Sequence, residues 1–295
     1  MNSNTRQTAL ITGASSGIGR ASVLQMARAG WHVFAAVRKI EDGEKLQAEN
    51  PASATPVIMD VTDRSSVFAA AEQVSSQLDG RGLDGLANIA GVGIAGPLEY
   101  VSPGDLQEIF DINVFGQITV TQAFLPALRR SRGRIVNITS VGAHIAIPFG
   151  GLLNASKAAF GLLSDTLRLE LRPFGIHVCT VEPGAIKTPA VDKTLGNVEA
   201  AIAKLPAQGA AEYGEMLRRF TRRAYAREMD GSSPEIVAKA VHHALTARRP
   251  RMRYRVGKHA HVLTTLPEIL PDSLLDRLRL KLLGLPTTFG AIKAE

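Results

Sequence analysis

Apolar and polar positions follow two spacings along the 295-residue chain. Short runs rich in apolar and β-branched residues predict strands, and stretches with helical spacing of apolar residues separate them. The predicted strands are 8–12, 31–37, 55–60, 85–88, 133–139, 176–182 and 253–256. The predicted helices are 18–29, 64–78, 102–130 with a break in its middle, 153–172 and 234–247.

This alternation predicts an α/β protein with a doubly wound, Rossmann-type parallel sheet that carries helices on both faces. No internal repeat or flexible linker divides the chain, so we expect one domain over residues 1–295. Residues 188–230 interrupt the alternation with helical sequence only, and we interpret them as a lid over the carboxyl edge of the sheet. We expect residues 258–295 to form a C-terminal helical extension.

Composition narrows the class of protein. Hydrophobic residues make up 45% of the chain and charged residues 21%, which excludes a disordered, collagen-like or disulfide-stapled protein. The single cysteine, Cys179, fits a reducing compartment. We find no secretion signal and no apolar run long enough to span a membrane, so we expect a cytoplasmic protein.

The net charge of +7 is concentrated near the C-terminus, where residues 216–295 carry 16 basic and 7 acidic side chains. Few aromatic residues lie among these arginines, so we expect no nucleic-acid partner. The segment 274–285, LLDRLRLKLLGL, is basic and amphipathic. It packs on the body of the protein, on a partner subunit, or on a membrane surface as a peripheral contact.

A glycine-rich turn joins the first strand to the first helix, in the sequence TGASSGIG. Gly13 allows a sharp turn off the strand, and Gly17 and Gly19 allow the backbone to approach a pyrophosphate. The N-terminus of the helix then offers free N–H groups and a positive partial charge to phosphates. The spacing therefore predicts a dinucleotide site.

The end of the second strand favours one of the two nicotinamide dinucleotides. NAD needs an acidic residue there to accept hydrogen bonds from ribose hydroxyls, whereas a guanidinium suits the 2′-phosphate of NADP. Val37 occupies the position of the acid, and Arg38 and Lys39 follow it. We therefore expect NADP(H) as the cofactor.

These features together resemble the short-chain dehydrogenase/reductase family. The resemblance rests on TGASSGIG, Asp60-Val61-Thr62, Asn88-Ile89-Ala90-Gly91, Asn113, Ser140, Ala155-Ser156-Lys157 and Pro183-Gly184. It runs continuously from about residue 8 to 188, and the later part is most similar to the subgroup of 17β-hydroxysteroid dehydrogenases.

The resemblance implies cofactor contacts at named positions. Asp60 accepts from the adenine amino group, Asn88 and Gly91 flank the adenine ribose, and Lys157 binds the hydroxyls of the nicotinamide ribose. Ile186 and Thr188 meet the carboxamide and the pyrophosphate. The other residues that the resemblance places along the cofactor are Ser15, Ser16, Ile18, Val61, Ala90, Pro183 and Gly184.

The resemblance also implies a catalytic set, and one member is missing. Ser140 polarises the substrate oxygen, Asn113 holds a proton-relay water, and Lys157 lowers the pKa of a tyrosine four residues before it. That position is Leu153. Leucine has no proton to give, and a positioned general acid contributes about 10²–10⁴-fold in rate.

Three interpretations of Leu153 stay open. In the first, water, the substrate or another side chain supplies the proton, and the candidate side chains are His144, four residues after Ser140, and Tyr213 or Tyr225 of the lid. In the second, the substrate needs little acid help, as an iminium or an activated alkene would. In the third, the protein binds NADP(H) without turnover and serves as a sensor, scaffold or partner subunit.

Apolar residues of the lid, such as Leu195, Leu205 and Phe220, either indicate an apolar, fairly bulky small-molecule substrate or form a face that packs on the sheet. No group of His, Cys, Asp or Glu has metal-ligand spacing, so we expect no catalytic metal. The resemblance implies a homodimer or homotetramer built on the long helices 113–130 and 153–172.

Overall fold

The structure is a computed structural model, and it describes residues 6–287. Its sheet has seven strands, all parallel, in the order β3-β2-β1-β4-β5-β6-β7. Their bounds are β1 Thr8–Ile11, β2 His32–Val37, β3 Ala54–Ile58, β4 Gly85–Asn88, β5 Arg134–Ile138, β6 His177–Pro183 and β7 Arg253–Val256. The predicted strands are confirmed, and their ends differ from the observed ones by at most two residues.

The strand order fixes where a ligand can bind. From β1 the chain adds β2 and β3 on one side, and then returns to the other side of β1 with β4. In open α/β sheets the crevice for a ligand opens at the carboxyl ends of the strands where this order reverses. That point lies between β1 and β4, at the start of the glycine-rich turn.

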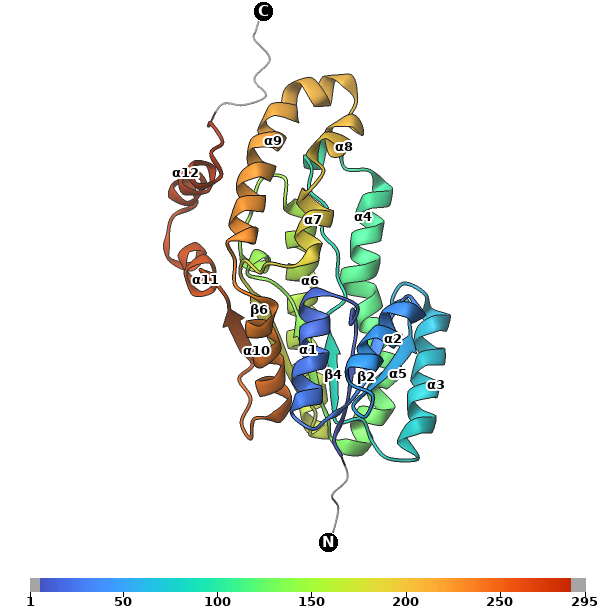
Figure 1. Cartoon of the computed structure of the whole chain (residues 1–295). Coiled ribbons are helices and arrows are strands. Elements are labelled where there is room, and N and C mark those ends of the chain that lie inside the picture. Colours follow the sequence, from blue (N-terminus) through green and yellow to red (C-terminus); the bar gives the residue numbers. More distant parts are fainter. Residues whose placement is uncertain (1–5, 288–295) are drawn as a thin grey trace, which may run out of the picture.

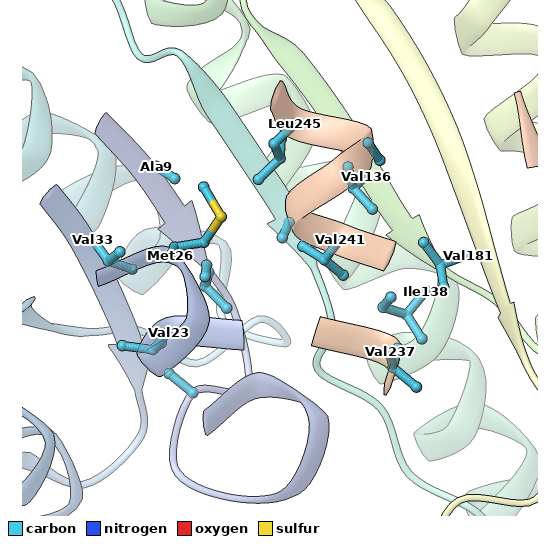
Figure 2. Close-up of a cluster of buried hydrophobic side chains, with 14 of the residues drawn as sticks. Ala9, Val23, Met26, Val33, Val136, Ile138, Val181, Val237, Val241 and Leu245 are labelled. Atoms are coloured by element: carbon cyan, nitrogen blue, oxygen red, sulfur yellow. The ribbon is translucent and has the colours of Figure 1, made fainter. Parts of the chain in front are cut away.

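Helices cover both faces of the sheet, as the alternating sequence pattern predicts (Figure 1). One face carries α1 (Gly17–Arg28), α2 (Ile40–Glu49) and α10 (Pro234–Thr246), and the other carries α3 (Arg64–Leu78), α5 (Gly116–Ser131) and α6 (Gly151–Leu171). On the first face, Met26 of α1 and Val241 of α10 meet Val136 and other strand residues in a fully buried cluster (Figure 2). These two cores hold the strand ends, and hence the site, in place.

The lid lies beyond the carboxyl edge of the sheet (Figure 1) and is helical, as predicted. It consists of α7 (Pro189–Leu195), α8 (Val198–Ala203) and α9 (Ala207–Met229). Phe220 of α9 packs against Phe149 from the loop before α6, and both are buried with Leu283 of α12 (Asp272–Leu283). This third apolar cluster joins the lid, that loop and the C-terminal extension.

The long helix predicted over 102–130 is broken. It consists of α4 (Pro103–Phe110), a π-helical turn η2 (Asp111–Phe115) and α5. Such π turns often occur at functional sites.

Helix α2 was not predicted, whereas α11 (Ala260–Ile269) lies in the helical extension expected over residues 258–295, of which 288–295 fall outside the described residues. In α2 only Gly43 and Leu46 are buried, so its apolar spacing is too weak to read. Within the described residues, no helix is long and apolar enough to cross a membrane.

Candidate active site

Three glycines shape the turn between β1 and α1, as the sequence predicts. Gly13 and Gly17 have positive φ angles of +63° and +52°. A Cβ on Gly13 would lie 2.9 Å from Ala90 Cα, and a Cβ on Gly19 would lie 2.0 Å from the carbonyl oxygen of Gly13. Any side chain at these two positions would therefore collide with backbone.

The first turn of α1 is open to an anion. Its N-cap residue, Ser16, makes no capping hydrogen bond through its side chain, and the first turn contains no acidic residue. Ser15 and Ser16 are exposed and Ile18 is half-buried. The unpaired N–H groups and the helix dipole thus meet the conditions for binding a pyrophosphate.

Thr12 joins the ends of β1 and β4, a role that the sequence analysis missed. Its hydroxyl accepts hydrogen bonds from the amides of Ile89 (2.8 Å) and Ala90 (3.0 Å). Asn88, expected beside the adenine ribose, is buried, and its amide donates to Thr121 Oγ1 and Asn137 Oδ1. Its side-chain amide holds the central strands together, while Gly91 is exposed; the contact of either residue with the adenine ribose stays a prediction.

The residues predicted to contact the adenosine of the cofactor lie at the ends of β2 and β3. Arg38 and Lys39 are exposed and line an open cavity of about 660 Å³ together with Ile58. Asp60 is half-buried, and its Oδ1 accepts from the amide and hydroxyl of Thr62, which fixes the direction of the carboxylate. Val61, the next residue of the predicted set, is buried.

Lys157 is buried on the first half of α6. Its Nζ donates to the carbonyl oxygen of Ile138 at 3.0 Å, at the end of β5. Burial lowers the pKa of this ammonium to about 8. A Cβ on Gly91 would come within 3.3 Å of the same Nζ, so the lysine lies next to the end of β4, where the resemblance places the cofactor.

Ser140 and Leu153 stand beside this lysine in the fold. The Ser140 hydroxyl accepts from the amide of Gly142 (3.0 Å), which leaves its own proton free to donate to a substrate oxygen. Leu153 is half-buried one helical turn before Lys157. A Cβ on Gly93 would contact both Leu153 Cδ2 (3.5 Å) and Thr194 of α7 (2.9 Å), so the lid closes down next to the leucine.

Asn113 lies in the π turn and is completely buried. Its amide donates to the Val92 carbonyl (2.9 Å) and to Ser156 Oγ (3.0 Å), and its Oδ1 accepts from the Val92 amide (2.9 Å). The side chain therefore braces the loop after β4 against α6, and all of its polar atoms have partners within the protein. Its predicted contact with a relay water remains a prediction.

His144 lies in the short helix η3 (Val141–His144), which packs between α6 and α11. Its Nε2 is 3.2 Å from Oε2 of Glu182, a buried residue of β6. Glu182 also accepts from Arg253 (2.7 Å) and lies 3.5 Å from Arg255, both on β7. The sequence analysis missed this buried ionic cluster, because a single Glu at a strand end carries no motif.

The segment after β6 reaches both the cofactor loop and the lid. Pro183 and Ile186 are buried, and a Cβ on Gly184 would lie 2.5 Å from the carbonyl of Lys258. Thr188 lies next to the turn before α1, because a Cβ on Gly17 would be 3.3 Å from its side chain. This contact brings two predicted phosphate-site residues together across the chain.

Ile186 also touches the lid. Its amide donates to Oε2 of Glu228 at the end of α9 (3.2 Å), and burial raises the pKa of that carboxyl. The resemblance implies that Ile186 and Thr188 meet the carboxamide and the pyrophosphate of the cofactor. In the structure Glu228 occupies the Ile186 amide, and no motif in the sequence points to that contact.

The tyrosines of the lid are tied to carboxylates. Tyr213 donates to Glu99 and Tyr225 to Asp192, each at 2.8 Å. These hydrogen bonds raise the pKa of both phenols, which makes them weaker acids. Neither tyrosine is therefore arranged to replace the proton donor missing at Leu153.

Comparison with known proteins shows that the chain is similar to short-chain dehydrogenases over most of its length. The family model for short chain dehydrogenases matches residues 7–199. The chain is 38% identical over 272 residues to retinol dehydrogenase 5 of Mus musculus, which covers 90% of this chain and 85% of that protein. It is 35% identical over 273 residues to 17-beta-hydroxysteroid dehydrogenase type 6 of Rattus norvegicus, with coverage of 90% and 85%.

A solved structure shows the same similarity in three dimensions. A short-chain dehydrogenase from Streptomyces avermitilis matches with a TM-score of 0.73 and 29% identity, over 95% of this chain and 96% of that one. The similarity thus extends well past the glycine-rich turn, through the sheet and the lid.

Proposed function

Because the chain belongs to the short-chain dehydrogenase family, we propose that it is an NADP(H)-dependent oxidoreductase of an apolar carbonyl, imine or activated alkene. The observation that carries the proposal is the open start of α1 behind a turn where only glycine fits, with Lys157 buried at the same edge of the sheet. When bound, the nicotinamide supplies or accepts a hydride.

The choice of NADP(H) rests on the end of β2. Arg38 and Lys39 are both exposed at the cavity beside Ile58, and Val37, at the position of the NAD-selective acid, is buried. Two cations without an intervening carboxylate favour a 2′-phosphate over free ribose hydroxyls. Glu41 lines the same cavity from the first turn of α2, and both cations remain exposed beside it.

An apolar substrate fits the surroundings of the site. The lid and the loop before α6 meet in the apolar cluster around Phe149, Leu217 and Phe220. A substrate between this cluster and the end of β4 would leave water on binding, which favours apolar molecules. The proposal of an apolar substrate therefore rests on this apolar cluster beside the site.

For the proton, the proposal assigns Lys157 as the source. Its Nζ is an ammonium one turn from Leu153, and burial brings its pKa close to neutral, to about 8. Ser140 donates a hydrogen bond to the substrate oxygen or nitrogen, and Lys157 Nζ gives up the proton that completes the reduction. His144 has its Nε2 3.2 Å from Oε2 of the buried Glu182, in a short helix that packs toward α11, which makes it the weaker candidate.

The experiment measures NADPH and NADH consumption by the wild-type protein and by Leu153→Tyr, against apolar ketones, quinones, imines and activated alkenes. We expect wild-type turnover with NADPH, with kcat/KM for reduction falling above about pH 8 because Lys157 must carry its proton. In Leu153→Tyr a phenol replaces that source, so the falling limb moves to another pH.

Leu153 itself favours a second function, an NADP(H)-binding protein without turnover. In that case NADPH still binds the wild-type protein, no substrate is reduced, and Leu153→Tyr restores activity. Failure of both proteins to bind either dinucleotide would refute both functions.

The proposal also includes a cytoplasmic homodimer or homotetramer assembled on α5 and α6. Leu162 and Leu169 of α6 are 71% and 59% exposed, which is high for large apolar side chains on a packed helix. The buried, unpaired Cys179 fits a reducing compartment. Light scattering after size exclusion measures the assembly.

A further inference from the structure

The short helix η3 determines where the Ser140 hydroxyl points. Ser140 is the N-cap residue of this helix, and its Oγ accepts a hydrogen bond from the amide of Gly142 (3.0 Å). Its carbonyl oxygen accepts from the amide of Ala143 (3.0 Å). A rotation of η3 would therefore turn the Ser140 side chain, and with it the hydroxyl that meets the substrate in the proposed function.

Two side chains from other elements anchor this helix. On α6, the amide of Asn154 donates to the carbonyl oxygen of Ile145 (2.9 Å), directly after η3. On β6, Oε2 of Glu182 lies 3.2 Å from Nε2 of His144, the last residue of η3. His144 is the only polar side chain of η3, so Glu182 reaches the helix at the one side chain that a carboxylate can hold.

Glu182 is buried, with 1% of its side chain exposed. A buried carboxylate destabilises the fold unless cations or hydrogen bonds compensate it. Arg253 and Arg255 of β7 supply that compensation, at 2.7 Å from Oε1 and 3.5 Å from Oε2. These two arginines join β7 to β6, whereas His144 is the partner that connects the carboxylate to the loop of the site.

The imidazole of His144 suits a positioning role. A carboxylate can only accept, so Nε2 carries the proton in the neutral ring and in the charged ring alike. Nε2 of His144 and Oε2 of Glu182 are both shielded from water, and neither forms a hydrogen bond with any other group among residues 6–287. The orientation of the ring therefore depends on Glu182.

The same ionic cluster reaches α6, the helix that carries Lys157. Arg253 donates to Oε1 of Glu182 through one guanidinium nitrogen and to Asp165 of α6 through another. Glu182 is thus tied to α6 through Arg253 and to η3 through His144. The lysine and the serine of the site are both held through one buried carboxylate.

We propose that Glu182 and His144 are a positioning pair for Ser140. The buried carboxylate fixes the imidazole, and the imidazole fixes the helix that directs the serine hydroxyl toward the substrate. The inference rests on the proposed oxidoreductase function and deepens it, because both residues act through Ser140 without touching substrate or cofactor.

The test varies His144, because a change of Glu182 would also leave the arginines of β7 without their buried partner. His144→Leu removes the donor and keeps a side chain of moderate size, whereas His144→Gln restores an N–H donor. The control is His242→Leu, since His242 is a half-buried histidine of α10, on the opposite face of the sheet from α6.

The first measurement is hydrogen–deuterium exchange of the backbone amides of residues 141–145 in the free protein. We expect His144→Leu to speed this exchange about tenfold, the loss of one hydrogen-bonding partner of a charged group. His144→Gln should exchange nearly as slowly as the wild type, and His242→Leu should leave exchange unchanged. Wild-type exchange in His144→Leu, or equally fast exchange in both His144 variants, would overturn the proposal.

The second measurement is a kinetic cycle with Ser140→Ala, on the member of the substrate panel that the wild type reduces fastest. His144→Leu should lower kcat about tenfold and leave the Kd for NADPH within about twofold, because a misplaced donor stabilises the transition state less. His144→Gln should recover most of the loss.

In the Ser140→Ala background, His144→Leu should change kcat by less than about twofold, because residues that act through one another are not additive. An equally large loss without the serine hydroxyl would show that His144 acts elsewhere, and would overturn the proposal. If the wild type consumes no NADPH, the proposed function fails, and amide exchange by itself decides whether the pair anchors the Ser140 loop.

Discussion

Lys157 allows a direct test of the site, because its burial has a cost that can be measured in the free protein. Burial lowers the pKa of the ammonium from 10.5 to about 8, and a tenfold change in proton affinity corresponds to about 1.4 kcal/mol. The charged side chain therefore destabilises the folded state by about 3 kcal/mol at pH 7. Lys157→Met removes this penalty but also removes the hydrogen bond to Ile138, worth about 1 kcal/mol.

The free energy of unfolding of the variant should thus be about 2 kcal/mol higher than that of the wild type at pH 7. Below pH 8 the lysine is charged in both states, so the full penalty applies. Between pH 8 and 10.5 the folded protein releases the proton that the unfolded chain still holds, so wild-type stability rises with pH relative to the variant.

Urea unfolding of both proteins at pH 7 and pH 9.5, followed by circular dichroism without cofactor, measures this difference. At pH 7 the midpoint of the variant should be the higher one, and at pH 9.5 the gap should shrink. The variant should also bind NADPH more weakly, which would show that a destabilising group is kept for function. A variant less stable than the wild type at pH 7 would refute the reasoning.

Three further substitutions test other parts of the site. Gly19→Ala should weaken NADPH binding, measured by fluorescence titration, at least about tenfold, because its Cβ would collide with the Gly13 carbonyl that shapes the phosphate loop; unchanged affinity would contradict this reading of the loop. Arg38→Ser should raise the Kd for NADPH and leave that for NADH nearly unchanged, and equal effects on both would argue against a 2′-phosphate contact. Glu182→Gln should lower the free energy of unfolding by about 3 kcal/mol, because cations beside it lose their buried partner. The surface control Glu199→Gln should change it by less than about 1 kcal/mol, and equal losses would mean that burial of Glu182 does not matter.

Much of the fold could be predicted from the sequence, because the signals are local. Apolar spacing within one strand or helix, and glycines within one turn, are set by neighbouring residues. This is why all seven strands and the glycine-rich turn were placed correctly. Helix α2 was not predicted because only Gly43 and Leu46 are buried along it, so its sequence carries a weak pattern of apolar spacing.

The candidate site was predictable in part. The residue types at Ser140, Lys157 and Leu153 follow from a short motif, and the sequence alone showed that a tyrosine is absent. The contacts that these residues make in the folded protein could not be predicted from the motif. That Asn113 braces the loop after β4 depends on a π turn that no spacing predicts.

Sequence by itself determined where the buried strands lie, the glycine-rich turn before α1 and the leucine at position 153 in place of a tyrosine. Each of these features depends on residues close together in the chain. Only the tertiary structure decided the surroundings of Glu182 and its contact with the Ser140 loop. Glu182 meets Arg253 across 71 residues, and it meets His144 from a strand that follows the whole of α6. Contacts of that kind arise when the strands of the sheet and the loop after β5 pack together, and no local pattern of side chains records them.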